Sequence, residues 1–151
     1  MRAVIQRVKK AAVSVDDKII SYINRGLLVL IGISTGDNIS DADYIIDKII
    51  NLRIFKDTEG KMNNSVSSID GELLIVSQFT LYGDARKGRR PSYSRAANGD
   101  KAEVIYNSFI NILKGVYPAD KIKTGKFAAM MEVELINDGP VTILLDSERT
   151  F

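Results

Sequence analysis

The chain has 151 residues, 45% of them hydrophobic, and a formal net charge of only +2, from 21 basic and 19 acidic side chains. This length is common for one domain, and the hydrophobic share is enough to form a core without disulfides or metals. The sequence contains no Cys and no His, which excludes disulfides, thiolate catalysis, a Ser-His-Asp triad and histidine-ligated zinc. Any catalysis must therefore use hydroxyls, carboxylates, lysines, backbone dipoles or groups that the substrate brings.

The cellular location is predicted from what the sequence lacks. Met1-Arg2 leads straight into alternating, strand-like residues, with no pattern of a secretory signal. The longest apolar run, Leu27 to Ile33, is too short to cross a bilayer, and the absence of Cys fits a reducing compartment. We therefore expect a cytoplasmic protein.

The first third of the chain is predicted to form strands. Apolar residues alternate over 4–15, Asp16-Asp17 is a plausible hairpin turn, and a second strand covers 18–23. The apolar run 27–33 is continuous enough to be a fully buried strand, and Gly32 within it indicates close packing or a bulge.

A helix follows these strands. Ser40 is its predicted N-cap, with Asp43 as a carboxylate variant of the capping box, and the helix is expected to end before Ile54. The polar, glycine-containing stretch 57–64 indicates a loop. The next strand is predicted over 73–79.

The second half of the chain is predicted to contain a second helix and two further strands. Asp100 and Glu103 are the predicted cap of a helix over 101–113, and strands are expected over 129–136 and 141–145. The sequence shows no repeat, low-complexity tract or linker. It therefore predicts one α+β domain, rich in strands and with two main helices.

Two polar segments lie against strand-like runs, Ser77-Gln78-Phe79-Thr80 and Asn137-Asp138-Gly139-Pro140-Val141-Thr142. Polar groups at the ends of buried strands are well placed to line a site. Together with the opening Met1–Val8 and the stretch Lys87–Ser92, these segments closely resemble the D-aminoacyl-tRNA deacylase family. The resemblance runs from Met1 to about Asp146.

The resemblance implies a fold, an activity and a partner chain. It implies one deacylase domain over 1–151, with 146–151 as a short tail, built on a barrel-like, mostly antiparallel sheet, and it implies a homodimer. The implied activity is hydrolysis of the ester bond of D-aminoacyl-tRNA, and of mischarged glycyl-tRNA, in chiral proofreading of translation. No cofactor, metal or membrane is implied. The alternative is a non-catalytic tRNA-binding or editing-associated module of the same fold.

The segment Ser77, Gln78, Phe79 and Thr80 is the candidate catalytic element. On a strand, Ser77 and Phe79 would lie on one side and Gln78 and Thr80 on the other. Hydroxyls, an amide and backbone N–H groups can surround a carbonyl oxygen. Spacing alone favours polar groups that merely close strand-end hydrogen bonds, and it is the resemblance that favours the catalytic interpretation. Thr80 has no coded base beside it, so we expect it to bind and orient the ester while the neighbouring ribose hydroxyl assists attack by water.

The resemblance assigns rejection of L-amino acids to the backbone of Gly139 and Pro140, reaching into the pocket of the partner chain. There a cis peptide would turn two neighbouring carbonyl oxygens the same way and form a rigid wall, whereas residue statistics alone favour a trans turn. Glycine, having no side chain, would escape rejection. By resemblance Arg7 hydrogen-bonds the Gly-Pro carbonyls; an exposed strand arginine is the other interpretation.

Further pocket residues follow from the resemblance alone. Phe127 and Met131 match positions near the adenosine or aminoacyl group, although their pattern also fits core residues, and Ala96 matches the adenine side. The chain departs from the family at Ala128 and Met130, where Gly and a polar residue are usual. These departures put the substrate preference in question.

Basic residues cluster after the first polar segment, in a chain that is otherwise nearly balanced in charge. Such a cluster suits a limited phosphate contact, although a solvated charged loop has the same composition. The predicted tRNA-binding residues are Arg86, Lys87, Arg89 and Arg90. Because phosphate contacts carry no sequence information, they cannot name the tRNA.

Overall fold

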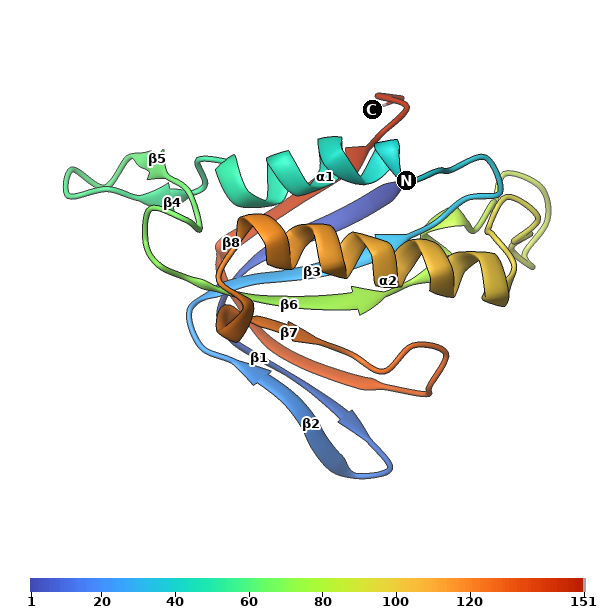
Figure 1. Cartoon of the computed structure of the whole chain (residues 1–151), viewed down its shortest axis with the longest axis horizontal. Coiled ribbons are helices and arrows are strands. Elements are labelled where there is room, and N and C mark those ends of the chain that lie inside the picture. Colours follow the sequence, from blue (N-terminus) through green and yellow to red (C-terminus); the bar gives the residue numbers. More distant parts are fainter. Residues whose placement is uncertain (151) are drawn as a thin grey trace.

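The computed structural model of the chain describes residues 1–150 and contains one large sheet covered by two helices (Figure 1). The central strand is β1 (Arg2–Val15), which pairs antiparallel with β2 (Lys18–Ile23) and β3 (Gly26–Gly32) along one edge. Along its other edge β1 pairs antiparallel with β8 (Glu132–Asp146). Phe151, the last residue of the expected tail, lies outside the described residues.

The sheet continues beyond β3 through two parallel pairs. β6 (Glu72–Ser77) lies beside β3, and β7 (Ile122–Thr124) lies beside β6. The Ser21 hydroxyl of β2 donates to the Thr124 carbonyl at 2.5 Å, so the two ends of the sheet approach each other. These contacts confirm the predicted barrel-like, mostly antiparallel sheet, and the only two parallel pairs within residues 1–150 both involve β6.

The core lies on both faces of this sheet, which explains the continuous apolar run of β3. Leu27, Val29 and Ile31 face a core shared with the helices, whereas Leu28 belongs to a second cluster inside the curved sheet. A strand buried on both faces needs apolar residues at consecutive positions. The second cluster is completed by Val8, Ala11, Val13, Ile23, Leu74 and Val76.

Helix α1 (Ser40–Asn51) packs on the outer face of the sheet with Ala42, Ile45 and Ile49 buried, as its 3.6-residue period predicts (Figure 1). The predicted cap at Ser40 is wrong, because Ser40 is already the first residue of the helix, and the side-chain bonds at this end come from Asn38 and Asp41. The Asn38 side-chain oxygen accepts from the Ser40 N–H at 2.9 Å, and the Asp41 carboxylate accepts from the Asn38 N–H at 3.0 Å. The reciprocal pairing of a capping box is thus present two residues upstream of the predicted position.

Helix α2 (Gly99–Val116) lies beside α1 on the same face. The predicted cap at Asp100 is also wrong: the Asn98 side chain accepts from the Lys101 N–H at 3.0 Å, and Asp100 lies inside the first turn. The helix extends past the predicted end through Gly115. Its buried residues include Ile105, Phe109 and Leu113, whereas Val104 is 68% exposed.

The other elements differ from the prediction in two places and agree with it at one turn. Strands β4 (Phe55–Lys56) and β5 (Met62–Asn64) form a hairpin where a loop was predicted, and the two strands predicted over 129–145 are the single strand β8. The Asp16-Asp17 turn is confirmed, with positive φ at both residues, as a two-residue hairpin turn requires. A 3₁₀-helix, η2 (Ala119–Lys121), connects α2 to β7.

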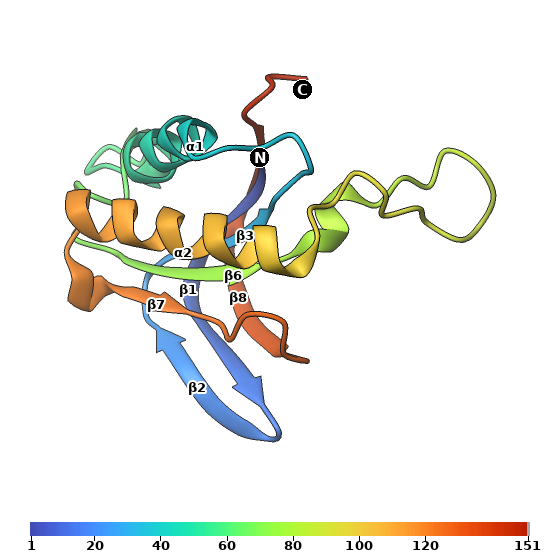
Figure 2. The ribbon, with the colours of Figure 1, turned by 45° about the vertical axis from the view of Figure 1, so that its right-hand side comes forward.

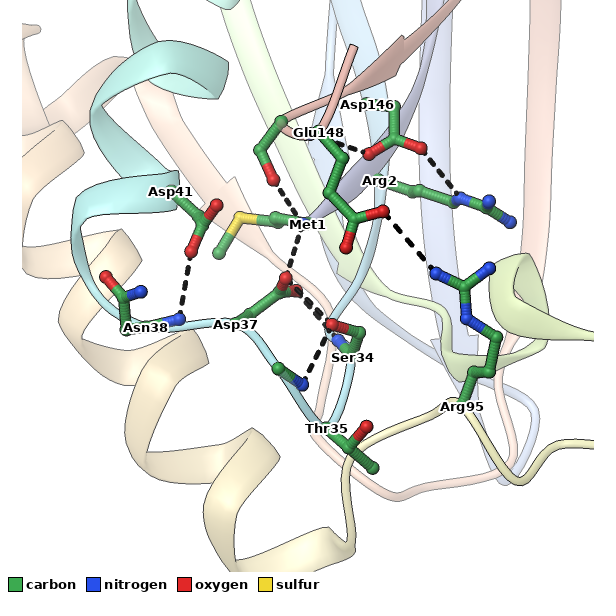
Figure 3. A network of polar contacts seen from close by, with 12 residues as sticks. Met1, Arg2, Ser34, Thr35, Asp37, Asn38, Asp41, Arg95, Asp146 and Glu148 are labelled. Atoms are coloured by element: carbon green, nitrogen blue, oxygen red, sulfur yellow. Dashed lines mark hydrogen bonds and ion pairs between the residues drawn. The ribbon is translucent and has the colours of Figure 1, made fainter. Parts of the chain in front are cut away.

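A buried polar network ties the N-terminus to the end of β8 (Figure 3). The Met1 ammonium donates to the Asp37 carboxylate at 2.7 Å and to the Ser147 hydroxyl at 2.5 Å. Asp37, only 4% exposed, also accepts from the N–H and hydroxyl of Ser34. The start of the expected tail is therefore held against the domain through Ser147. None of the helices within residues 1–150 has the length and apolarity needed to cross a membrane.

Candidate active site

A pocket of about 700 Å³ lies where β3 and β6 end, beside the start of α2. Its walls come from four parts of the chain: the ends of the two strands, the turn after β6, the first residues of α2 and the 127–133 segment. The lining residues are Ile31, Ile33, Val76, Ser77, Gln78, Phe79, Thr80, Ala97, Gly99, Ala102, Phe127, Ala128, Ala129, Met130, Met131 and Val133. Ligands bind preferentially at the carboxyl ends of parallel strands, and β3 and β6 are such a pair.

All four residues of the candidate catalytic segment line this pocket, but not in the predicted geometry. β6 ends at Ser77, and the chain turns into a 3₁₀-helix, η1 (Phe79–Tyr82). The expected alternation of sides is therefore wrong beyond Gln78. The Gln78 N–H still donates to the Ile31 carbonyl at 2.7 Å, so the last bond of the sheet fixes where the turn begins.

Gly32 makes this turn possible. A Cβ atom at Gly32 would lie 3.0 Å from the Gln78 carbonyl oxygen and 2.9 Å from the Leu81 Cβ. The expectation of close packing at Gly32 is thus confirmed, and the neighbour that approaches is the segment that carries the candidate catalytic residues. A side chain at this position would push η1 away from the pocket.

Within the segment, the Gln78 amide donates to the Thr80 hydroxyl oxygen at 2.5 Å. An amide N–H cannot remove a proton, so this bond orients the hydroxyl and leaves its own hydrogen for another acceptor. The backbone N–H groups of Phe79 and Thr80 start a 3₁₀-helix and have no acceptor among the hydrogen bonds of the described residues. One hydroxyl and two N–H groups are thus available at the strand end.

The wall opposite this segment is apolar. Phe127 packs against Tyr106 with 5.7 Å between ring centroids, and the Tyr106 hydroxyl donates to the Ile75 carbonyl at 2.9 Å. Burial raises the pKa of Tyr106, so its hydroxyl stays neutral. Met131 is partly buried against the second core cluster, and both Phe127 and Met131 line the pocket.

The family departures lie on the same wall. Ala128 has φ of +57°, a left-handed conformation that is cheaper for the Gly usual in the family. The Met130 side chain is 92% exposed at the rim. Ala96 does not line the pocket, being paired with Ser34 in a β-bridge, whereas its neighbour Ala97 and the helix residue Ala102 do. Sequence reasoning missed these two, although their place around the α2 cap was a usable signal.

Gly139 and Pro140 lie outside this pocket, on an exposed stretch of β8. Their peptide bond is cis, as the resemblance implies, and Gly139 has φ of +121°. A Cβ atom at Gly139 would lie 2.5 Å from the Arg7 Nη2 atom. The Arg7 side chain therefore lies directly against Gly139.

Arg7 is only 4% exposed, so the interpretation as an exposed strand arginine is wrong. Its Nε atom donates to the Asp138 carbonyl at 3.1 Å and lies 3.2 Å from the Asp138 carboxylate, and its Nη1 atom donates to the Ile54 carbonyl. The partner is thus the carbonyl before Gly139, where the resemblance implied those of Gly139 and Pro140. Asn137 adds bonds to the Arg7 and Val141 carbonyls, each 2.9 Å long.

The predicted tRNA-binding residues lie on a loop that projects from the body of the domain after η1 (Figure 2). The base of this loop is closed by paired backbone bonds between Asp84 and Ser92. Arg86 donates to the Asp84 carboxylate at 2.9 and 2.6 Å, and these bonds lower the pKa of Asp84. Lys87, Arg89 and Arg90 are exposed and have no carboxylate partner among residues 1–150.

Among residues 1–150 no group of three or more Asp or Glu side chains is arranged to hold a metal ion, and the sequence offers no His or Cys.

Comparison with known proteins identifies the family. The model of the D-Tyr-tRNA(Tyr) deacylase family matches residues 4–146. The chain belongs to this family. Its members named D-aminoacyl-tRNA deacylase include proteins from Thermosipho africanus and Syntrophus aciditrophicus, which are 58% and 57% identical over 151 residues, the full length of each chain.

Solved structures give the same result for the fold. A structure titled c-Myc DNA Unwinding Element Binding Protein is 46% identical, has a TM-score of 0.93, and covers 97% of this chain and 98% of its own. A structure of a probable eukaryotic D-amino acid tRNA deacylase is 20% identical with a TM-score of 0.77, over 95% of this chain and 97% of its own, and supports the fold alone. The deacylase fold expected from the sequence is thus confirmed.

Proposed function

We propose that this chain hydrolyses the ester bond of D-aminoacyl-tRNA, and of glycyl-tRNA, and spares L-aminoacyl-tRNA. The observation that carries the proposal is the position of residues 77–80 at the mouth of the 700 Å³ pocket, in a member of the deacylase family. The pocket is large enough for a terminal adenosine with its aminoacyl group. The proposed place of action is the cytoplasm.

In this proposal, Thr80 positions the ester and is not acylated. Its hydroxyl already accepts from Gln78, an amide that cannot act as a base, and the chain has no histidine that could. The free N–H groups of Phe79 and Thr80 would stabilise the oxyanion as water attacks, and each such donor contributes about 3–4 kcal/mol in acyl-transfer sites. The neighbouring ribose hydroxyl assists the attack. Together these groups provide positioning and charge stabilisation, which an already activated aminoacyl ester needs most.

We further propose that selection against L-amino acids depends on a second chain. Gly139 and Pro140 are exposed and are not among the residues that line the pocket of their own chain, so they would have to enter the pocket of a partner. The same strand exposes the apolar residues Ile136, at 46%, and Leu144, at 55%, which a partner would cover. Backbone placed against the α-carbon would exclude an L side chain and admit D-amino acids and glycine.

Binding of tRNA is assigned to the projecting loop. Arg86, Lys87, Arg89 and Arg90 are exposed on one projecting loop that follows η1, and η1 itself contributes Phe79 and Thr80 to the pocket (Figure 2). An acceptor stem would contact this loop while its 3′ end enters the pocket. These contacts hold the phosphate backbone and do not choose the tRNA.

The deciding experiment measures release of amino acid from D-tyrosyl-tRNA, L-tyrosyl-tRNA and glycyl-tRNA by purified protein, with a chelator present. We expect rapid loss of the D and glycyl esters and survival of the L ester. Loss of all three would retain the esterase and reject the Gly-Pro filter. No loss of any would support the non-catalytic tRNA-binding module instead.

The shared site is tested by mixing two variants of reduced activity, Thr80→Val and Gly139→Ala. If Gly139 acts in the partner's pocket, a mixed dimer contains one site with an intact Thr80 and an intact Gly139, so activity returns on mixing. If both residues act within one chain, no mixed dimer is active. Two different affinity tags confirm that mixed dimers have formed.

A further inference from the structure

A second pocket, of about 440 Å³, lies on the other side of η1 from the candidate active site. Its lining residues are Arg2, Tyr82, Gly83, Asp84, Ala85, Arg86 and Arg95. Three of these seven residues carry guanidinium groups, Arg2 from β1 and Arg86 and Arg95 from the segment 84–95. Nothing in the catalytic proposal above uses Arg2 or Arg95.

Two of the guanidinium groups are held on one aromatic ring. The Cζ atoms of Arg2 and Arg95 lie 4.7 and 5.8 Å from the centroid of the buried Tyr82 ring. Arg2 is fixed further by the Asp146 carboxylate at 3.2 Å and the Leu81 carbonyl at 3.1 Å. Two like charges brought together in a concave site, each pre-oriented, are typical of a site that binds an anion.

Arg95 is the group most easily released for a ligand. Its ion pair to Glu148 (Figure 3) is 3.5 Å long, and the two side chains are 50% and 48% exposed. Exposed pairs of this kind contribute little stability, so exchanging Glu148 for a phosphate oxygen costs little. Arg2, in contrast, is tied to the buried Asp146 and would keep its place.

The charge around the pocket favours an anion as well. The segment 84–95 contains five basic residues and one acidic residue, whereas the whole chain has a net charge of only +2. Most of the excess positive charge of the protein is therefore concentrated beside this pocket, on the projecting loop (Figure 2).

The two pockets adjoin the same short 3₁₀-helix. Thr80 lines one pocket and Tyr82 the other, and both belong to the four-residue η1. At about 2 Å per residue, the whole of η1 is only about 8 Å long. The sugar of one nucleotide spans a separation of this order between its acylated 3′ side and its own 5′ phosphate.

We propose that the Arg2–Arg95 pocket binds the phosphodiester that joins the last two nucleotides of the tRNA. This inference rests on the proposed function, because it takes the ester in the first pocket as the reference point. The planar guanidinium groups would hold the phosphate oxygens and set the depth to which the terminal adenosine enters. The pocket would thus favour substrates that have a second nucleotide, whatever the base of that nucleotide.

Three substrates of increasing length test the proposal: D-tyrosyl-adenosine, which has no phosphate, D-tyrosyl-CpA, which has one phosphodiester, and D-tyrosyl-tRNA. For Arg95→Gln we expect KM to rise about tenfold with CpA and with tRNA, kcat to stay constant, and hydrolysis of the adenosine ester to be unchanged. Arg90→Gln, on the loop outside this pocket, should raise KM with tRNA alone. Arg53→Gln, exposed at the β4–β5 hairpin, is the matched control and should change none of the three.

The outcomes separate this inference from the proposed function. Wild-type protein that hydrolyses none of the substrates overturns the proposed function. In an active wild-type protein, the phosphate site is overturned if Arg95→Gln affects all three substrates alike, affects only tRNA, or affects none. Arg95→Lys keeps the charge without the planar fork, so we expect it to recover part of the loss with CpA, and a change in unfolding midpoint would reveal a merely structural effect.

Discussion

Replacing Gly139 with alanine tests both the local structure and the proposed role of this segment. The added methyl group would lie 2.5 Å from the Arg7 Nη2 atom and 3.1 Å from the Val141 Cγ2 atom. Relief requires the buried Arg7 guanidinium to move, and that movement breaks its contacts with the carbonyl and carboxylate of Asp138. The segment itself would then lose its support.

The expected loss in free energy of unfolding has two parts. An L-residue at a φ of +121° loses about 1–2 kcal/mol for the backbone conformation alone. Overpacking against a buried side chain adds about 1–3 kcal/mol. We therefore expect Gly139→Ala to lower the free energy of unfolding by about 2–5 kcal/mol and to reduce hydrolysis of D-tyrosyl-tRNA.

Gly60→Ala provides the matched control. Gly60 also has a positive φ, +79°, but no atom lies within 4 Å of its Cβ position. This variant should lose only the backbone part, about 1 kcal/mol, and should keep full activity. The two unfolding free energies come from urea titrations followed by circular dichroism. Equal values for both variants, with full activity in each, would refute the close contact between Gly139 and Arg7.

Three other predictions follow from named contacts. Asp37→Asn should lower the free energy of unfolding by about 3–5 kcal/mol, because the buried Met1 ammonium loses its charged partner at 2.7 Å; the exposed Asp43→Asn is the control in the same urea titration. Burial acts to raise the pKa of Asp146, but hydrogen bonds from Thr150, the Glu148 N–H and Arg2 outweigh it and lower that pKa below 3.8. The stability contributed by this carboxylate is therefore present at neutral pH and lost as the pH falls below 3.8, so the gap in unfolding free energy between wild type and Asp146→Asn should narrow from pH 7 to pH 3. Thr80→Val should reduce kcat about 100-fold while Thr80→Ser keeps most of it, and a trapped acyl-Thr80 ester in mass spectra would contradict the positioning role.

Periodic patterns were sufficient to predict the main elements. The alternation in β1, the continuous apolar run of β3 and the helical stripe of α1 each state how many faces of an element are buried. The helix caps were misplaced because Ser, Asp and Asn all accept a backbone N–H, and several lie close together before each helix. The choice of Asn38 and Asn98 depends on backbone angles that the sequence does not state.

The candidate site was predicted only in part, and the reason is similar. The segment 77–80 was found as polar residues after a strand, but Phe79-Thr80-Leu81-Tyr82 has no local signal that separates a 3₁₀-turn from a continued strand. The close approach of Gly32 and the bond from Gln78 to Ile31 determine that turn, and both contacts join residues about 46 positions apart. The helix residue Ala102 likewise lines the pocket only because α2 starts beside it.

Local sequence patterns therefore predicted the strand-rich α+β class, the two helices and the segments most suited to carry a site. Composition alone excluded histidine and cysteine chemistry. Tertiary structure alone decided which separate segments meet: Arg7 against Gly139, and Arg2 with Arg95 on Tyr82. Periodicity and turn chemistry act between neighbouring residues, so they can be recognised in a short window of sequence. Contacts between distant residues depend on how the whole sheet curves and on where each strand ends, which no short window contains.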